Sequence, residues 1–249
     1  ARPPSPRERN RDDLDELTAA FVEMLERVES LVFSVRQVST DVAHDLRTPL
    51  SHVRQLLDVA RDENADMGRR VAAIDAADDR LIDVMRTFDA MLRLAELESG
   101  AALTQAAPVN LGEIVDRVVD AFRPDIEASG RKLETHIKQV IVHADKDLLS
   151  QAIANLIESA VRHTPEGSTI TVKATSEAGG AGLIVQDNGP GIPASEREAV
   201  LGRFYRLERS RSSAGTGLGL SIVAAIAKMH RATLSLEDAA PGLLVRLQF

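Results

Sequence analysis

The sequence predicts a multidomain protein of the α and α+β classes: an antiparallel helical hairpin that forms a dimeric four-helix bundle, followed by an α/β sandwich. Three observations indicate this architecture. One apolar stripe runs along residues 14–42, a second runs along residues 71–95, and helix-like and strand-like segments alternate from residue 109 onward. Because two helices alone cannot close a core, burying both stripes favours a homodimer over a monomeric hairpin that rests on the second half.

Composition excludes several classes of protein. The 249 residues include 44% hydrophobic residues, enough for one or two packed cores. The net charge of −8 has no basic block, so nucleic acid is not an expected partner. The sequence contains no cysteine, which excludes disulfides and thiolate metal sites. It has no apolar run long enough to span a membrane, so we expect this stretch to be soluble and any membrane anchor to lie outside it.

The first half reads as a lead-in followed by two helices. Residues 1–10 are rich in proline and charge, and heptad spacing then continues to Val42. The periodicity lapses at residues 62–68, which predicts the turn of the hairpin. The returning helix is predicted to end near residue 100 and to present its stripe to the first helix. That stripe comprises Val71, Ile74, Leu81, Met85, Phe88, Leu92 and Ala95.

In the second half, helix-like and strand-like segments alternate, which predicts a mixed sheet covered by helices on one face. The predicted elements, in order, are a helix at 111–130, a strand-like stretch at 133–145, a helix at 146–162, strands at 168–176 and 181–189, a helix at 218–230, and strands at 232–238 and 243–249.

His44 lies in the first helix, directly before an acid and close to a helix breaker. A lone helical histidine is usually an ordinary surface residue. Here Asp45 can orient the imidazole, and Pro49 cannot donate to the carbonyl of Asp45, so the helix should bend there. Arg47 and Thr48 follow within one turn. This combination favours a histidine that carries phosphate.

Two glycine-rich segments indicate a nucleotide site. The first, DNGPGI, follows a strand and begins with Asp187, whose carboxylate could accept a hydrogen bond from an exocyclic amine. The second, GTGLGLS, opens the helix that starts near Leu218, where free amides favour phosphate oxygens. One such cluster is weak evidence, but two separated by a charged, serine-rich loop are stronger.

These segments resemble those of bacterial two-component sensor histidine kinases. HDLRTPL resembles the phosphoacceptor box, and the glycine clusters resemble the G1 and G2 boxes, which gyrase, MutL and Hsp90 ATPases share. RFYRLERSRSS is similar to the F box and a rather short ATP lid. The resemblance implies catalytic roles for His44, Asp45, Thr48 and Asn155. It implies ATP binding by Asp187, at the adenine, together with Asn155, Arg162, His163, Gly189, Gly191, Phe204, Tyr205, Gly215, Thr216, Gly217, Leu218, Gly219 and Leu220.

The segment NLIESAVRHTP departs from the family pattern. It resembles the N box, whose two asparagines help to hold Mg²⁺, but Ser159 stands where the second asparagine is usual. Asn155 and Ser159 are four residues apart, hence on one helical face. A serine hydroxyl can bind Mg²⁺, so we expect either a working kinase with Mg²⁺ at Asn155 and Ser159, or weakened metal binding.

The resemblance also implies domains, partners and location. We expect a lead-in and HAMP-like helix at 1–35, a dimerisation and histidine phosphotransfer domain at 36–100, a linker at 101–108, and a catalytic ATP-binding domain at 109–249. The implied partners are a second copy, a response-regulator receiver domain and the protein's own sensor and transmembrane region. The implied location is the cytoplasmic side of the bacterial inner membrane.

Alternatives from other classes stay open at this stage. One is a kinase-impaired protein that is phosphatase-biased, or a scaffold that binds nucleotide without catalysis. Ser159 is its sequence support. Another is an ATPase of the chaperone or repair type, which would have no use for a histidine box.

Overall fold

The computed structural model describes residues 47, 49–62, 64–98, 106–177, 180–207 and 217–249. Several predicted features lie outside these ranges: the helix before residue 47, most of the ATP lid, and the site residues His44, Asp45, Thr48, Gly215 and Thr216. None of the described helices is long and apolar enough to cross a membrane.

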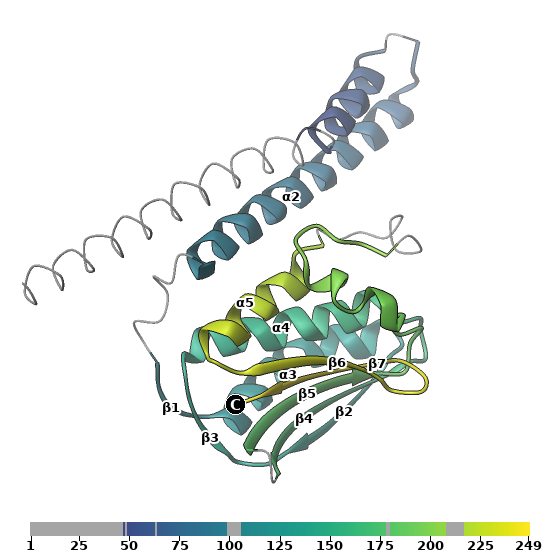
Figure 1. The fold of residues 1–249 in the computed structure, drawn as a ribbon. Coiled ribbons are helices and arrows are strands. Elements are labelled where there is room, and N and C mark those ends of the chain that lie inside the picture. The colour runs from purple at the N-terminus through teal and green to yellow at the C-terminus, as the bar shows by residue number, and fades with distance from the viewer. Residues whose placement is uncertain (1–46, 48, 63, 99–105, 178–179, 208–216) are drawn as a thin grey trace, which may run out of the picture.

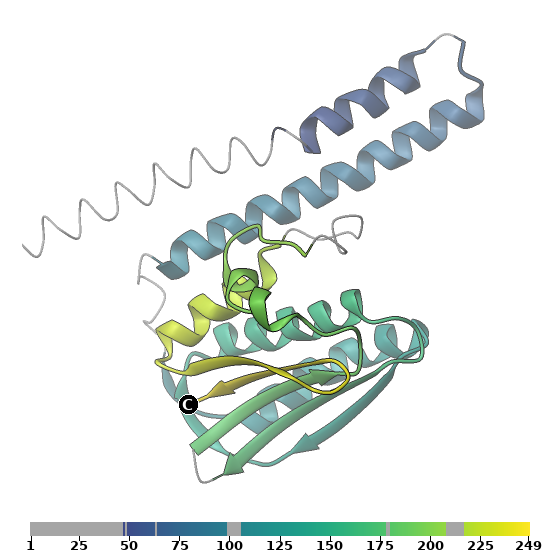
Figure 2. The ribbon, with the colours of Figure 1, turned by 45° about the vertical axis from the view of Figure 1, so that its right-hand side comes forward.

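A helix over residues 49–61 runs antiparallel to α2 (Met67–Glu98), as Figures 1 and 2 show. The turn lies where the periodicity lapses. Its Asp62 carbonyl accepts hydrogen bonds from Arg70 Nε and Nη2 at 3.2 and 2.8 Å. The Asp66 carboxylate accepts from the Arg69 amide at 2.9 Å and so caps the start of α2. The predicted turn is therefore confirmed.

The single chain does not itself bury the predicted stripe of α2. Small side chains, Ala73 and Ala77, are 6% and 4% exposed in the N-terminal half of α2. The larger side chains of the predicted stripe remain exposed in the single chain: Val71, Ile74, Leu81, Met85, Phe88 and Leu92. Small residues allow closer helix packing, and apolar periodicity alone does not say which of two neighbouring faces meets the hairpin partner.

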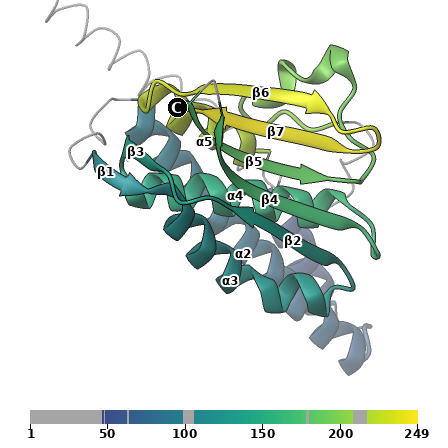
Figure 3. The same ribbon diagram turned by 90° about the horizontal axis from the view of Figure 1, so that it is seen from below.

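The second half is a two-layer sandwich (Figures 1 and 3). A five-stranded sheet has the order β2-β4-β5-β7-β6, and only its β2–β4 pair is parallel. Its strands are β2 (Lys132–Ile137), β4 (Thr169–Glu177), β5 (Gly180–Asp187), β6 (Thr233–Asp238) and β7 (Leu243–Gln248). One face carries α3 (Leu111–Ala128), α4 (Lys146–His163) and α5 (Gly219–Met229). The predicted mixed sheet with helices on one face is confirmed.

The stretch predicted as strand-like at 133–145 is two strands that belong to different sheets. After β2, the chain forms β3 (Ile141–Ala144), which pairs antiparallel with β1 (Ala107–Asn110), a strand that was not predicted. The inward positions shift from odd-numbered residues in β2 to even-numbered residues in β3. A change of phase in the alternation marks a break in the strand, because successive side chains point to opposite faces.

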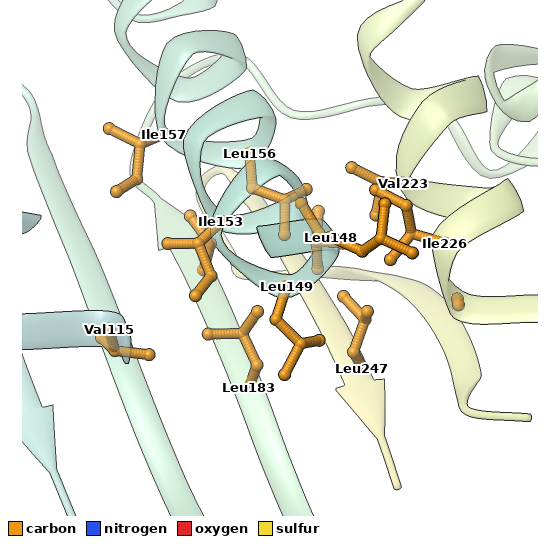
Figure 4. Close-up of a cluster of buried hydrophobic side chains, with 14 of the residues drawn as sticks. Val115, Leu148, Leu149, Ile153, Leu156, Ile157, Leu183, Val223, Ile226 and Leu247 are labelled. Atoms are coloured by element: carbon orange, nitrogen blue, oxygen red, sulfur yellow. The ribbon is translucent and has the colours of Figure 1, made fainter. Parts of the chain in front are cut away.

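The core is centred on α4, which lies over the middle of the sheet (Figure 4). Its Leu149 and Ile153 are fully buried, and the next turn adds Leu156 and Ile157 at 2% and 0% exposure. Burying each such side chain stabilises the fold by about 1.5–3 kcal/mol. The Asp145 carboxylate caps the helix by accepting from the amides of Asp147 and Leu148 at 2.9 and 3.1 Å. This anchoring fixes where the outer face of α4 lies.

Candidate nucleotide-binding site

Asp187 ends β5 and is half-buried. Its Oδ1 accepts a hydrogen bond from the Gly189 amide at 2.8 Å, and the Leu243 amide also donates to its carboxylate. Burial raises the pKa of Asp187 above its ordinary value, and these two backbone bonds act in the opposite direction. The carboxylate is thus oriented by backbone and partly desolvated, which suits recognition of an amine donor.

The loop after Asp187 lies against the end of α4. A Cβ on Gly189 would come within 2.7 Å of Thr164 Cγ2, so this position has room only for glycine. Gly191 has a φ of +63°, in the left-handed region that favours glycine. Both predicted glycines are therefore required by close packing of the loop, and this packing sets the position of Asp187 relative to α4.

Asn155, Ser159 and Arg162 succeed one another at steps of four and three along α4, so they share one face. Among the buried side-chain polar atoms that the structure describes, only Asn155 Nδ2 lacks a hydrogen-bond partner. A buried amide donor without a protein acceptor fits a ligand oxygen, such as a phosphate oxygen or a metal-bound water. Asn155 and Ser159 both carry oxygen donors of the kind that Mg²⁺ binds.

Arg162, at the end of α4, stands near Arg206, which follows the Phe204-Tyr205 pair. Burial lowers the pKa of Arg206, and the neighbouring charge of Arg162 lowers it further. Two guanidinium groups that repel one another are stabilised when an anion joins them. The pair therefore provides a cationic element at the same end of α4 as the loop of Asp187.

Phe204 and Tyr205 take different directions. Phe204 has a φ of +59° and its side chain packs against the hydrophobic core. Tyr205 is 38% exposed, and its hydroxyl donates to Glu196 Oε2 at 2.9 Å. Phe204 thus anchors the segment that carries Arg206.

The start of α5 completes the arrangement. Gly217 has a φ of +69°, and a Cβ there would approach the Phe204 carbonyl carbon to 3.0 Å. By contrast, a Cβ on Gly219 would meet no described atom within 4 Å. Leu218 is fully buried and Leu220 packs against the core, so these two leucines can serve a ligand only through their backbone. No side chain caps this helix N-terminus, which suits phosphate.

The fold brings together, at the C-terminal end of α4, the described parts of the four segments predicted to bind nucleotide. These are the N box, the G1 box, the F box with the lid, and the G2 box. His163 also lies there, exposed at the last turn of the helix. Sequence reasoning missed Arg206 and Leu243. Arg206 could have been found in the sequence, because it is a cationic residue directly after the aromatic pair Phe204-Tyr205. Leu243 had no signal, because only the pairing of β7 beside β5 brings its amide to Asp187.

Comparison with known proteins places the chain in a family. Residues 144–249 match the family described as histidine kinase-, DNA gyrase B- and HSP90-like ATPase. The sensor protein IrlS of Burkholderia pseudomallei is 34% identical over 230 residues, covering 91% of this chain and 49% of that protein. The signal transduction histidine-protein kinase/phosphatase MprB of Mycolicibacterium vanbaalenii is 31% identical over 239 residues, covering 93% of this chain and 48% of that protein.

A solved structure of a mycobacterial sensor histidine kinase MprB is 30% identical, with a TM-score of 0.51, and covers 57% of this chain and 95% of that one. The chain spans about half the length of the curated relatives it matches. Fold, site geometry and relatives agree: the chain belongs to the two-component sensor histidine kinases, a family of ATP-dependent protein kinases, and carries their GHKL-type ATP-binding domain.

Proposed function

We propose that the chain binds Mg-ATP at the end of α4 and autophosphorylates on His44. An imidazole nitrogen of His44 attacks the γ-phosphorus, the bond from the γ-phosphorus to the bridging oxygen breaks, and ADP leaves. The observation that carries this proposal is that Asp187, Arg162 and Arg206 lie around one end of α4. The carboxylate suits the adenine amine, and the two guanidinium groups suit the phosphates. Asp45 would orient His44 and accept its proton.

Different residues would bind the adenine, the phosphates and the Mg²⁺ ion. Asp187 would accept from the adenine amino group, while the α5 amides, Arg162 and Arg206 would neutralise phosphate charge. Asn155 and Ser159 would hold Mg²⁺, which supplies further charge neutralisation at the phosphates. His163, Phe204 and Tyr205 would line or anchor the site. The residues Gly215 and Thr216 would extend the backbone cradle.

We further propose that the phosphohistidine passes its phosphoryl group to an aspartate of a response regulator. The MprB relative is named a kinase/phosphatase, which supports a second activity in which Thr48 positions a water that dephosphorylates the regulator. The domain boundaries at 36, 101 and 109, the HAMP-like helix before them and a membrane-bound sensor region belong to the same proposal.

The exposed stripe on α2 supports a homodimer. Val71, Ile74, Leu81, Met85, Phe88 and Leu92 are each between 43% and 52% exposed, apart from Met85 at 62%. Their heptad spacing, with Asp78 in the one polar position, is typical of a helix that packs against helices of a second copy. We propose that this stripe closes a four-helix bundle.

Incubation with γ-labelled ATP and Mg²⁺ tests the proposal. We expect acid-labile, base-stable label on the wild-type chain and none on His44→Ala, with ADP as the product. Equal labelling of His44→Ala would overturn the assignment of the phosphoacceptor. Nucleotide binding without label on either chain would instead favour the alternative of a phosphatase-biased or scaffolding protein, which Ser159 supports. Release of free phosphate without a labelled intermediate would point to a simple ATPase.

A further inference from the structure

The turn between β6 and β7 presses on the loop that carries Asp187. Gly242 has a φ of +115°, and a Cβ there would lie 1.8 Å from the Asp187 carbonyl oxygen. In return, a Cβ on Gly191 would lie 2.6 Å from the Gly242 carbonyl oxygen. The two backbones are therefore in direct contact, which only glycine permits at both positions. A displacement of one segment must move the other.

This contact brings a second backbone donor to the site. The Leu243 amide, the next one after Gly242, donates to the Asp187 carboxylate and adds to the local bond from Gly189. The Gly189 bond is made within the loop itself, whereas the Leu243 bond depends on where the β6–β7 turn lies. The orientation of Asp187 is thus shared between two segments far apart in the sequence.

Arg197 joins these two segments. Its Nε donates to the Ile192 carbonyl at 3.1 Å, on the loop side, and its Nη2 lies 3.9 Å from Asp238 Oδ2, at the end of β6. The Arg197 side chain is 24% exposed, against 69% for Asp238. An exposed ion pair contributes little on its own, so the hydrogen bond to the loop carbonyl is the stronger half of the bridge.

We propose that Arg197 is a positioning residue of the nucleotide site. It holds the β6–β7 turn against the G1-box loop so that the Leu243 amide orients the Asp187 carboxylate toward the adenine amine. This inference rests on the proposed binding of adenine nucleotides. In this proposal Arg197 acts through Asp187 and not by its own contact with the nucleotide.

The test compares ADP affinity, measured by calorimetry across a range of pH, for Arg197→Gln, Arg197→Lys and a matched control. Arg246→Gln is that control. Arg246 lies on the same hairpin, has a side chain that is 29% exposed, and pairs through Nε with Glu237 Oε1 at 3.5 Å, so both partners lie on the hairpin itself. Thermal unfolding of each variant measures its stability separately.

We expect Arg197→Gln to weaken ADP binding about three- to tenfold, the equivalent of roughly one hydrogen bond. Loss of the Leu243 bond would raise the pKa of Asp187, so the fall of affinity in acid should move to higher pH. Arg197→Lys should restore part of the affinity, and Arg246→Gln should bind as wild type. Gly242→Ala should act in the same direction more strongly.

Other outcomes overturn the inference. An Arg197→Gln variant with wild-type affinity and an unchanged acid limb would show that the bridge does not position Asp187. Equal losses in Arg197→Gln and Arg246→Gln would assign the effect to general loosening of the hairpin. If the wild-type chain bound no ADP, the proposed nucleotide site would fail first, and that result is distinct from a failure confined to the variants.

Discussion

The Arg203 guanidinium forms an ion pair with the carboxylate of Glu98. Glu98 is the last residue of α2, and Arg203 directly precedes Phe204, the residue that anchors the segment of Arg206. Beside this pair, the last turns of α2 enter the core of the sandwich through Met91, Leu94 and Leu97. The end of the helical hairpin and the nucleotide-binding half are therefore packed together, with the charge pair at the edge of their contact.

Breaking this pair should loosen the contact between α2 and α5 without unfolding either half. Both side chains are about one-third exposed, at 35% for Glu98 and 32% for Arg203, so the pair is worth about 1 kcal/mol or less. We expect Glu98→Gln to speed amide exchange at the α2–α5 contact up to about fivefold. Glu96→Gln is the control. Glu96 lies two residues before Glu98 and pairs with Arg93 of the same helix. Equal exchange in both variants would contradict a role for the pair.

Asp187→Asn should separate nucleotide binding from stability. The substitution keeps the size of the side chain but removes the charge that we propose accepts from the adenine amine, so ADP affinity should fall about 10- to 100-fold. The unfolding free energy at neutral pH should not fall, because the variant no longer buries a carboxylate. Calorimetry and thermal melts measure the two effects. A matched loss of stability and affinity would mean that Asp187 is structural.

The pH dependence of stability follows from the same residue. Burial raises the pKa of Asp187 in the folded state above its unfolded value, so the folded state holds the proton to a higher pH. The contribution of Asp187 to the free energy of unfolding therefore increases as pH falls through the raised pKa. Above that pKa the folded state buries an ionised carboxylate, which lowers stability. The stability of the wild type relative to Asp187→Asn should therefore fall as pH rises through the raised pKa. Parallel melting curves at every pH would contradict this expectation.

Sequence reasoning reached the parts of the fold that depend on local pattern. The α4 helix and the position of Asp187, at the end of a strand and before a glycine turn, follow from apolar spacing and glycine content, which are local. Periodicity found the stripe that α2 exposes in the single chain but not Ala73 and Ala77, which are buried, because alanine carries less apolar signal than the larger side chains of the stripe. The Leu243 amide was equally hidden, since any residue supplies an amide and only sheet order brings it to the site.

Ser159→Asn should strengthen metal-dependent ATP binding. Asparagine is longer than serine and would place a carbonyl oxygen one turn beyond Asn155, so we expect about threefold to tenfold tighter binding with Mg²⁺ and little change when the metal is chelated. Ser150→Asn makes the same chemical change on α4 at a serine whose hydroxyl donates to the Lys146 carbonyl at 2.8 Å. It should leave binding unchanged. If Ser159→Asn bound no better, Ser159 would be a neutral replacement for the usual asparagine.

Charge placed in the exposed stripe of α2 should dissociate the proposed dimer. Met85 and Phe88 are 62% and 43% exposed in the single chain, and burial of such side chains against a second copy contributes about 1.5–3 kcal/mol each. Met85→Arg should therefore weaken self-association at least about tenfold, as measured by sedimentation equilibrium, because an arginine there would be desolvated without a partner. Ala72→Arg adds the same charge at an exposed position of α2 outside the stripe and should leave association intact. Dissociation by both variants would indicate repulsion by net charge, and dissociation by neither would mean that the stripe is not the interface.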